Sequence, residues 1–205
     1  MDPQLSFDIH IATTVKKANQ VLGLIKFNFK HLNAQCLLLL YKALVRSILE
    51  YAQSVCSPHL KKHIAAIEAV QKRATKILPN IRSLPYNKRL QFLQLPTLVY
   101  RRLRGDMIET YKMLHGHYDS RCIPSLQLAS DRPTRGHSFK LYKPAVCSGP
   151  RAHSFSIRIV NPWNSLPDHV VTAPSINSFK NRLDSHWFQQ EILYNYKADF
   201  SFLDH

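Results

Sequence analysis

The chain has 205 residues, of which 45% are hydrophobic, and it carries 28 Lys and Arg against 13 Asp and Glu, a formal net charge of +15. A hydrophobic fraction of this size supports a packed core and argues against a disordered chain. The longest apolar run, near Cys36 to Tyr41, has roughly half the length of a membrane span, which argues against a transmembrane protein.

The positive charge is concentrated in one part of the chain. Residues 61 to 104 hold eleven Lys and Arg and a single acid, Glu68. Residues 1 to 116 carry a net charge of +12 and residues 117 to 205 a net charge of +3, so the balance changes near Gly116. Clustered positive charge is typical of proteins that bind a polyanion. We therefore expect a helical domain over residues 1–116, which holds the binding surface, and a small module over residues 117–205.

Apolar spacing predicts two helices at the start of the chain. Steps of four and three residues indicate an amphipathic helix whose buried seam is Ile11, Val15, Ala18, Leu22, Ile25 and Phe29. Asn33 is a suitable N-cap for a second, largely buried helix that ends before Ser57-Pro58. Its expected stripe is Leu37, Leu40, Tyr41, Leu44, Ile48 and Leu49.

The third helix is expected to have one apolar face and one basic face. Ser57 as N-cap and Pro58 at the first position predict a start, and Pro79 predicts a stop after Leu78. The apolar face is Ile64, Ile67, Val70, Ala74 and Ile77. The basic face is Lys61, Lys62, Lys72, Arg73 and Lys76, which share an arc of roughly 120°.

Prolines and a glycine delimit two further helices. Pro85 and Pro96 bracket a short one, with Leu90 and Leu93 facing inward and Lys88 and Arg89 facing outward. The next helix begins near Thr97 and ends at Gly116, a residue typical of helix C-termini. Its first half carries Arg101, Arg102 and Arg104, and cations at that end oppose the helix dipole, so something other than helix stability must account for them.

After Gly116 the pattern changes to that of a small α+β module. Alternating apolar residues predict strands over Ser138 to Tyr142 and Ser154 to Val160, followed by a tight turn from Asn161 to Pro167. Ser175 then caps a final helix whose inward residues are Ile176, Phe179, Leu183 and Trp187. The expected fold class is therefore mainly α: a helical bundle followed by this module.

The four cysteines lack any metal-type spacing, so we expect free thiols in a reducing compartment. Met1 leads into acidic residues rather than a basic and then apolar run, so no signal peptide is predicted and the nucleus or cytoplasm is expected. Neither a nucleophile elbow nor a phosphate-binding loop occurs. His115, His117 and Cys122 provide too few ligands for a metal site, and no cofactor is expected.

Five blocks in order resemble the region after the catalytic palm in reverse transcriptases of LINE-type, Jockey-like non-LTR retrotransposons. They are KKANQVLGLIKFN (16–28), LVRSILEYAQSVCSP (44–58), IEAVQKRATKIL (67–78), LPTLVYRRLRGDMIETYKMLHG (95–116) and NPWNSLPDHVVTAPSINSFKNRLDSHW (161–187). The resemblance spans nearly the whole chain. It implies a helical thumb and a C-terminal segment that grip an RNA/DNA or RNA template-primer duplex, with palm and fingers supplied by a separate segment.

The sequence does not predict an enzyme on its own. Polymerase chemistry needs a pair of carboxylates that hold two Mg²⁺ ions, and no YxDD or other Asp-Asp pair is present. The resemblance therefore implies binding without catalysis, and Mg²⁺ only in an intact polymerase. The alternatives are a helical protein-interaction module, whose stripe from Ile11 to Phe29 pairs with another helix, and a retroelement remnant without function.

Each candidate contact residue also has a structural interpretation. For Lys61, Lys62, Lys72, Arg73 and Lys76 it is a solvated helix face, yet the near absence of acids favours phosphate contacts, with a log-log salt slope of about −4 to −6. For Arg101, Arg102 and Arg104 it is ion pairing with Glu68, Asp106 or Glu109, and Arg46 is expected to pair with Glu50. Stacking on bases, as in proteins that bind single strands, is the alternative for Tyr51, Tyr86, Tyr100 and Tyr111, but their positions favour core or rim residues. Trp163 and Trp187 are interpreted as core anchors.

Overall fold

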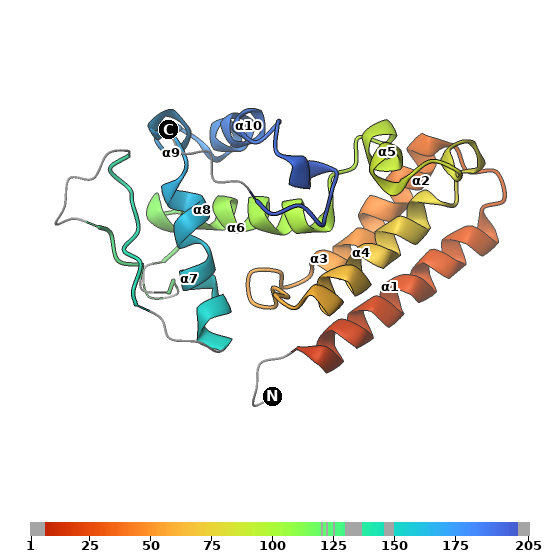
Figure 1. Cartoon of the computed structure of the whole chain (residues 1–205), viewed down its shortest axis with the longest axis horizontal. Helices are drawn as coiled ribbons and strands as arrows, with labels where there is room; N and C mark the ends of the chain where they lie inside the picture. Colours follow the sequence, from red (N-terminus) through yellow and green to blue (C-terminus); the bar gives the residue numbers. More distant parts are fainter. Residues whose placement is uncertain are drawn as a thin grey trace. The chain divides into compact units, whose positions relative to one another are not determined.

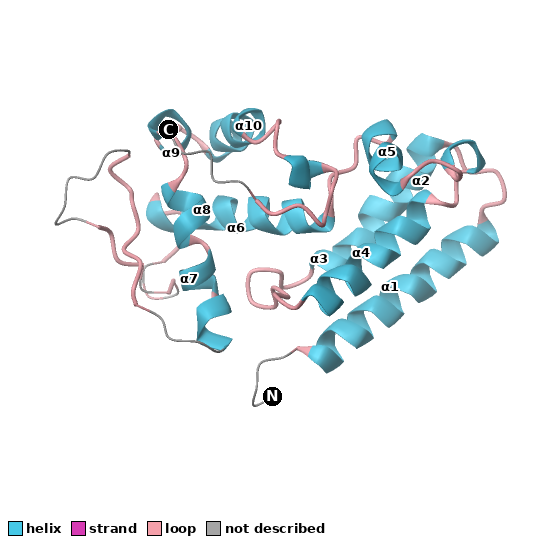
Figure 2. Cartoon of the chain, viewed as in Figure 1, coloured by secondary structure: helices cyan, strands magenta, loops and turns pink. Residues whose placement is uncertain are grey.

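The computed structural model describes residues 7–119, 121, 123–124, 126–129, 137–145 and 150–200. These residues are mainly helical (Figure 1), and their β structure is one isolated antiparallel bridge between Leu128 and Leu141 (Figure 2). The expected mainly α class is therefore confirmed. The chain divides into unit 1, Met1–Arg102 with Glu191–Ala198, and unit 2, Leu103–Gln190 with Asp199–His205. This division lies ahead of Gly116, inside a helix.

Unit 1 is an assembly of helices around one hydrophobic core. Its elements are α1 (Asp8–Asn28), α2 (Ala34–Leu40), the π-helical segment η1 (Tyr41–Arg46), α3 (Ser47–Glu50), α4 (Lys61–Thr75), the 3-10 turn η2 (Pro79–Ile81), α5 (Tyr86–Phe92), the first turn of α6 (Leu98–Leu114) and the 3-10 turn η4 (Glu191–Leu193). Thr97 joins η4 to this unit, because its backbone N–H donates to Leu193 O at 2.9 Å and its hydroxyl donates to Ile192 O at 2.6 Å.

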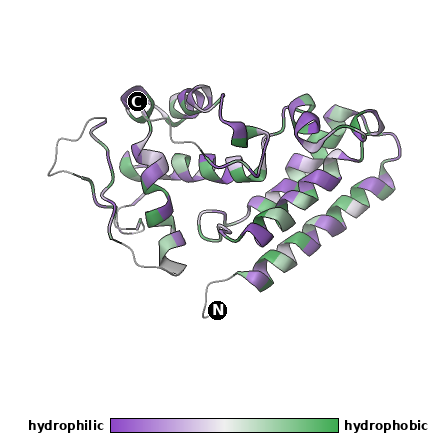
Figure 3. Cartoon of the chain, viewed as in Figure 1, coloured by the Kyte–Doolittle hydropathy of each residue, from purple (hydrophilic) through white to green (hydrophobic). Residues whose placement is uncertain are grey.

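Helix α1 buries the seam expected from its sequence. Ile11, Ala18, Leu22 and Ile25 are buried, and α1 packs against α4 and η1. Hydrophobic and hydrophilic residues alternate around the helix (Figure 3), as an amphipathic surface helix requires. Phe29 was expected to close this seam, but it is exposed because α1 ends at Asn28 and the chain leaves the core there. The protein's own helices cover the stripe that was the candidate surface for a partner helix.

The second helix contains a π-helical segment that changes which residues face the core. Asn33 caps it as expected, because its side chain accepts from the backbone N–H of Cys36 at 2.7 Å. The buried residues are Leu37, Tyr41, Val45 and Leu49, each four positions apart, and they would drift by about 40° per step in an α-helix. The wider turns of η1 remove much of that drift. Val45 is therefore buried in place of Leu44, which the α-helical period placed inward.

Two details of α4 and α5 differ from the expectations. Helix α4 begins at Lys61 rather than at Pro58, because Pro58 is buried in an irregular link and the first helical N–H groups donate to Leu60 O. Arg89 of α5 was expected to face outward, but it is 1% exposed. Its guanidinium lies 5.5 Å from the centre of the Tyr86 ring, a cation–π contact that compensates for part of the lost hydration.

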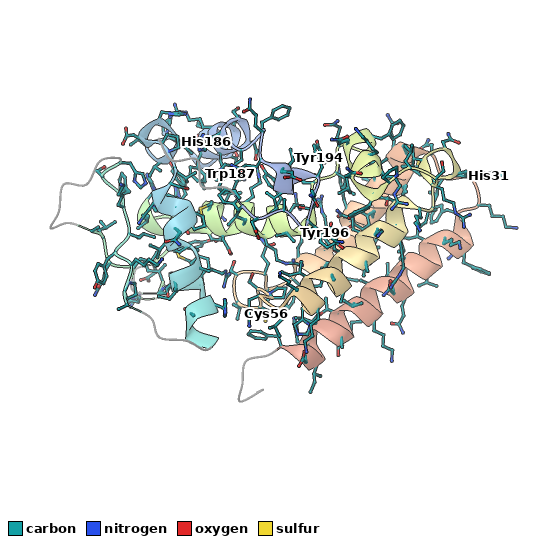
Figure 4. All side chains as sticks on the ribbon, in the orientation of Figure 1. His31, Cys56, His186, Trp187, Tyr194 and Tyr196 are labelled. Atoms are coloured by element: carbon teal, nitrogen blue, oxygen red, sulfur yellow. The ribbon has the colours of Figure 1, made fainter. Side chains whose placement is uncertain are left out.

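A buried polar network connects α4, α5 and α6 inside unit 1. The carboxylate of Glu68 accepts from the Tyr86 hydroxyl at 2.6 Å and from the backbone N–H of Leu98, the first residue of α6, at 3.1 Å. Gln71 accepts from the Tyr41 hydroxyl at 2.7 Å and donates to Pro96 O at 2.9 Å. The ring of Tyr86 also meets Tyr196, labelled in Figure 4, edge to face at 6.3 Å.

Unit 2 packs short helices against the rest of α6. These are the 3-10 turn η3 (Pro150–His153), α7 (Phe155–Arg158), α8 (Val160–Asn164), α9 (Asp168–Val171) and α10 (Ile176–His186). Trp163, Phe179, Leu183 and Trp187 are fully buried, which confirms both tryptophans as core anchors. The ring of Tyr111 stacks on Phe179 at 4.4 Å, and Ser175 caps α10 as expected by accepting from the backbone N–H of Ser178.

The strand expected over residues 154–160 is instead helical, and the turn expected over residues 161–167 begins inside helix α8. Phe155, Ile157 and Ile159 alternate in sequence, but Phe155 and Ile157 are only partly buried. The buried residues are Ile159, Val160, Pro162, Trp163 and Leu166, among which Ile159, Trp163 and Leu166 have the four-and-three spacing of a helix. Pro162 is tolerated because it lies in the first turn of α8. The other expected strand, Ser138 to Tyr142, contributes only the bridge at Leu141. The described residues therefore do not confirm the α+β prediction for this module.

Candidate nucleic-acid interface

Helices α1 and α4 run in the same direction, and this brings their C-terminal halves together. Near the start of both helices, Lys62 Nζ lies 2.9 Å from a carboxylate oxygen of Asp8, and His63 Nε2 lies 2.6 Å from it. Further along both, the guanidinium of Arg73 donates to the side-chain oxygen of Asn19. The two helices lie side by side in Figure 1. Late residues of α1 therefore lie opposite late residues of α4.

A groove occupies this end of unit 1 and has a volume of about 380 Å³. Its walls come from α1, from the end of α4 and from the turn after it. We call it the basic groove, lined by Asn19, Leu22, Gly23, Lys26, Arg73, Lys76, Ile77 and Arg82. The four cations among these residues are exposed, whereas Leu22 belongs to the hydrophobic core and fixes the floor. The groove therefore presents exposed cationic side chains above a residue of the hydrophobic core.

No carboxylate of the described part of unit 1 lines the basic groove. Asp8 pairs with Lys62 and His63, and Glu50 pairs with Arg46 and Arg101. Glu68 is buried in the polar network, and Glu191 accepts from the side chain of Asn195 at 2.7 Å. The four groove cations are consequently free of neutralising acids from these positions. Such a surface attracts phosphate groups more strongly than a mixed one.

The helix dipoles explain only part of this charge. The groove lies near the C-terminal ends of α1 and α4, where each dipole is equivalent to about half a negative charge. Two helix ends together offset about one of the four positive charges. About three remain in excess, so fold stability alone does not account for the cluster. The excess is the physical argument for an anionic ligand.

The structure separates the five cations expected on α4. Arg73 and Lys76 line the groove, whereas Lys61 and Lys62 lie at the opposite end of the helix. Lys62 pairs with Asp8, and the Nζ of Lys72 lies 5.9 Å from the centre of the Tyr86 ring. All five are exposed. The five cations are therefore exposed as predicted, but only those at the C-terminal end of α4 lie beside cations from other elements.

The arginines of α6 are engaged in the fold. Arg101 forms a two-bond pair with Glu50, and Arg104 forms one with Asp184, in which the second bond measures 2.7 Å. Arg102 is buried, and its charge acts on the carboxylate of Glu68. Arg46 lies 3.8 Å from Glu50, as expected. These ion pairs support the interpretation of the arginine cluster as structural rather than as a nucleic-acid contact. The partners of Arg101 and Arg104 differ from those expected.

Sequence reasoning missed two of the four groove cations. Lys26 lies in the last turn of α1, and Arg82 directly follows η2. Neither shares a helix with Arg73, so no helical spacing connects them. The signal that could have found them is the parallel register of α1 and α4, in which both contacts join residues 54 positions apart in sequence, Asp8 with Lys62 and Asn19 with Arg73.

Other candidate residues do not form a second site among the described residues. Tyr100 and Tyr111 are buried, Tyr86 is half-buried, and Tyr51 is exposed. His115 stacks on Tyr111 at 4.0 Å, while Cys122 lies outside the described residues. In the described part of the chain, no group of three His, Cys, Asp or Glu could hold a metal ion, and no helix is long and apolar enough to cross a membrane. Cys36 and Cys56 are free thiols.

Comparison of the chain with protein-family models, with curated proteins and with solved structures finds no match. A function for the chain therefore rests on its own residues and on the geometry of the basic groove.

Proposed function

We propose that the chain binds nucleic acid through backbone phosphates, as the thumb and C-terminal part of a LINE-type reverse transcriptase. The observation that carries the proposal is the basic groove, in which four cations from α1, α4 and the turn after η2 gather and which no carboxylate of the described residues lines. Phosphate contacts of exposed Lys and Arg do not read base identity, so binding is independent of sequence. The partner is an RNA/DNA or RNA template-primer duplex, and polymerase chemistry belongs to a palm segment.

The groove also sets the expected salt dependence. Each phosphate neutralised by a cation contributes about 0.9 to the slope of log K against log salt. Four groove cations predict a slope of about −3 to −4. This is less than the slope expected from the sequence, because three of the five α4 cations lie outside the groove and because Arg101 and Arg104 are held in ion pairs within the fold. The measured slope therefore gives the number of cations that contact phosphates of the ligand.

A charge-reversal experiment tests the proposal. We expect the double variant Arg73→Glu, Lys76→Glu to weaken binding to a labelled RNA/DNA hybrid and to reduce the salt slope by about two, measured by fluorescence anisotropy at several KCl concentrations. The matched control is Lys42→Glu, Lys88→Glu, which changes two exposed cations of unit 1 outside the groove by the same charge. At 0.15 M salt, charges farther away than about 8 Å are largely screened, so a charge reversal acts mainly on phosphates close to the substituted residue.

Three results would count against the proposal: no binding to the hybrid, binding that is independent of salt, or equal losses in the two double variants. Equal losses would mean that net charge matters and the groove does not. Far-UV circular dichroism of each variant shows whether the helices remain intact. Because all four substituted side chains are exposed, we expect the spectra to coincide.

A further inference from the structure

An exposed aromatic ring stands beside the basic groove. Phe27 of α1 is 80% exposed, whereas Leu22 and Ile25, on the core side of the same helix, are buried. It follows Gly23, a groove residue, by four positions, so the two lie within about 40° of each other around the helix. Lys26 precedes it and also lines the groove. The ring is therefore at the edge of the cationic surface.

One position next to Phe27 on the helix surface, Gly23, carries no side chain. A Cβ atom added at Gly23 would meet nothing within 4 Å, so the backbone is open one turn before the ring. Glycine in the middle of a helix costs stability relative to alanine, about 0.5–1 kcal/mol. Here no tight turn and no close packing requires it. An open strip of backbone beside an exposed ring leaves room for a flat group.

We propose that Phe27 stacks on an unpaired base whose neighbouring phosphates lie on the cations of the basic groove. The inference rests on the proposed nucleic-acid binding and specifies its ligand. Aromatic side chains beside cations are the elements with which proteins hold single strands, because every base has a face that can stack. Bases inside a duplex are already stacked on each other and cannot meet the ring. The preferred ligand is therefore a duplex with a single-stranded tail.

The charge of the surroundings decides between a nucleic acid and a protein helix as the occupant. An apolar protein surface would cover Phe27 together with Leu24, which lies three positions before it on the same helix and is 61% exposed. It would also bring the groove cations against an apolar partner and desolvate them at a cost. A nucleotide offers a flat ring and a phosphate together. It satisfies both features of the surface at once.

Three ligands and three variants test this inference. The ligands are a blunt RNA/DNA hybrid, the same hybrid with a single-stranded tail, and the tail alone. We expect the wild-type protein to bind the tailed hybrid more tightly than the blunt one, and Phe27→Ala to lose about 5- to 150-fold on the tailed hybrid only. Phe27→Trp keeps the preference for the tail. Leu24→Ala, an exposed aliphatic control on the same helix, leaves both affinities unchanged.

The outcomes distinguish the two proposals. If no ligand binds, the proposed function fails, and the stacking inference fails with it. If blunt and tailed hybrids bind equally and Phe27→Ala changes neither, the groove remains a phosphate-binding surface and the stacking inference alone is overturned. Equal losses from Phe27→Ala and Leu24→Ala would also overturn it, because they indicate a general apolar contact. The salt slope should stay the same in Phe27→Ala, since no phosphate contact is removed.

Discussion

The buried carboxylate of Glu68 gives a prediction about the pH dependence of stability. Glu68 is 1% exposed, and its burial raises the pKa of the carboxyl above the ordinary value. The hydrogen bonds from Tyr86 and Leu98 and the charge of Arg102 offset part of that rise. The folded protein therefore holds this proton more tightly than the unfolded chain. As pH rises from the ordinary glutamate range through the raised pKa, the free energy of unfolding falls.

The variant Glu68→Gln isolates this effect because it does not titrate. One proton gives a slope of at most about 1.4 kcal/mol per pH unit, so the stability of wild type relative to the variant should fall at up to that rate as pH rises. At neutral pH the variant should also lose about 1–3 kcal/mol. Its amide would have to accept from both Tyr86 and Leu98 with one oxygen, whereas the carboxylate uses two.

Urea unfolding followed by far-UV circular dichroism between pH 4 and pH 8 measures this difference. Tryptophan fluorescence is unsuitable, since both tryptophans of the chain, Trp163 and Trp187, belong to unit 2. Tyr86→Phe removes a hydrogen bond that lowers the pKa of Glu68, so it should move the pH-dependent range upward. A difference between wild type and Glu68→Gln that stays constant across this pH range would refute the reasoning.

Two further predictions concern single residues at helix ends and interiors. Ser175→Ala should destabilise unit 2 by about 1 kcal/mol in urea unfolding followed by tryptophan fluorescence, because it removes the cap of α10; an equal loss in Ser178→Ala would contradict this. The same change at two glycines should have opposite signs. Gly116→Ala should lower the melting temperature because Gly116 has φ +70°, whereas Gly23→Ala in α1 should raise it, and shifts in one direction would contradict the comparison.

Local signals predicted the helices well because helix formation depends on neighbouring residues. Asn33 and Ser175 cap their helices as expected, and Gly116 ends α6 in the left-handed conformation. The errors arose where local patterns were short. Phe155 to Ile159 alternates over too few residues to distinguish a strand from two helical turns, and the decisive burial of Trp163 lies beyond that window. Tertiary packing selected the helix there.

The candidate site was harder to predict than the fold. The period of one helix placed Arg73 and Lys76 on an exposed face, but Lys26 reaches the groove because α1 packs parallel to α4, and Arg82 reaches it from the turn after η2. That packing is a property of the assembled core, and no spacing within either helix encodes it. Arg89 shows the same limit, since Tyr86 and the surrounding core bury a residue that helical period placed outward.

The π-helical segment η1 has a consequence for changes in chain length. Leu37 and Leu49 are twelve positions apart, which in an α-helix would separate them by about 120° around the axis. Eleven positions almost complete three turns and would leave them about 20° apart. Deleting the exposed Ala43 would thus let the segment close as an ordinary α-helix with both leucines still facing the core. The deletion of one residue should therefore be tolerated here, inside a buried helix, where such changes are normally excluded.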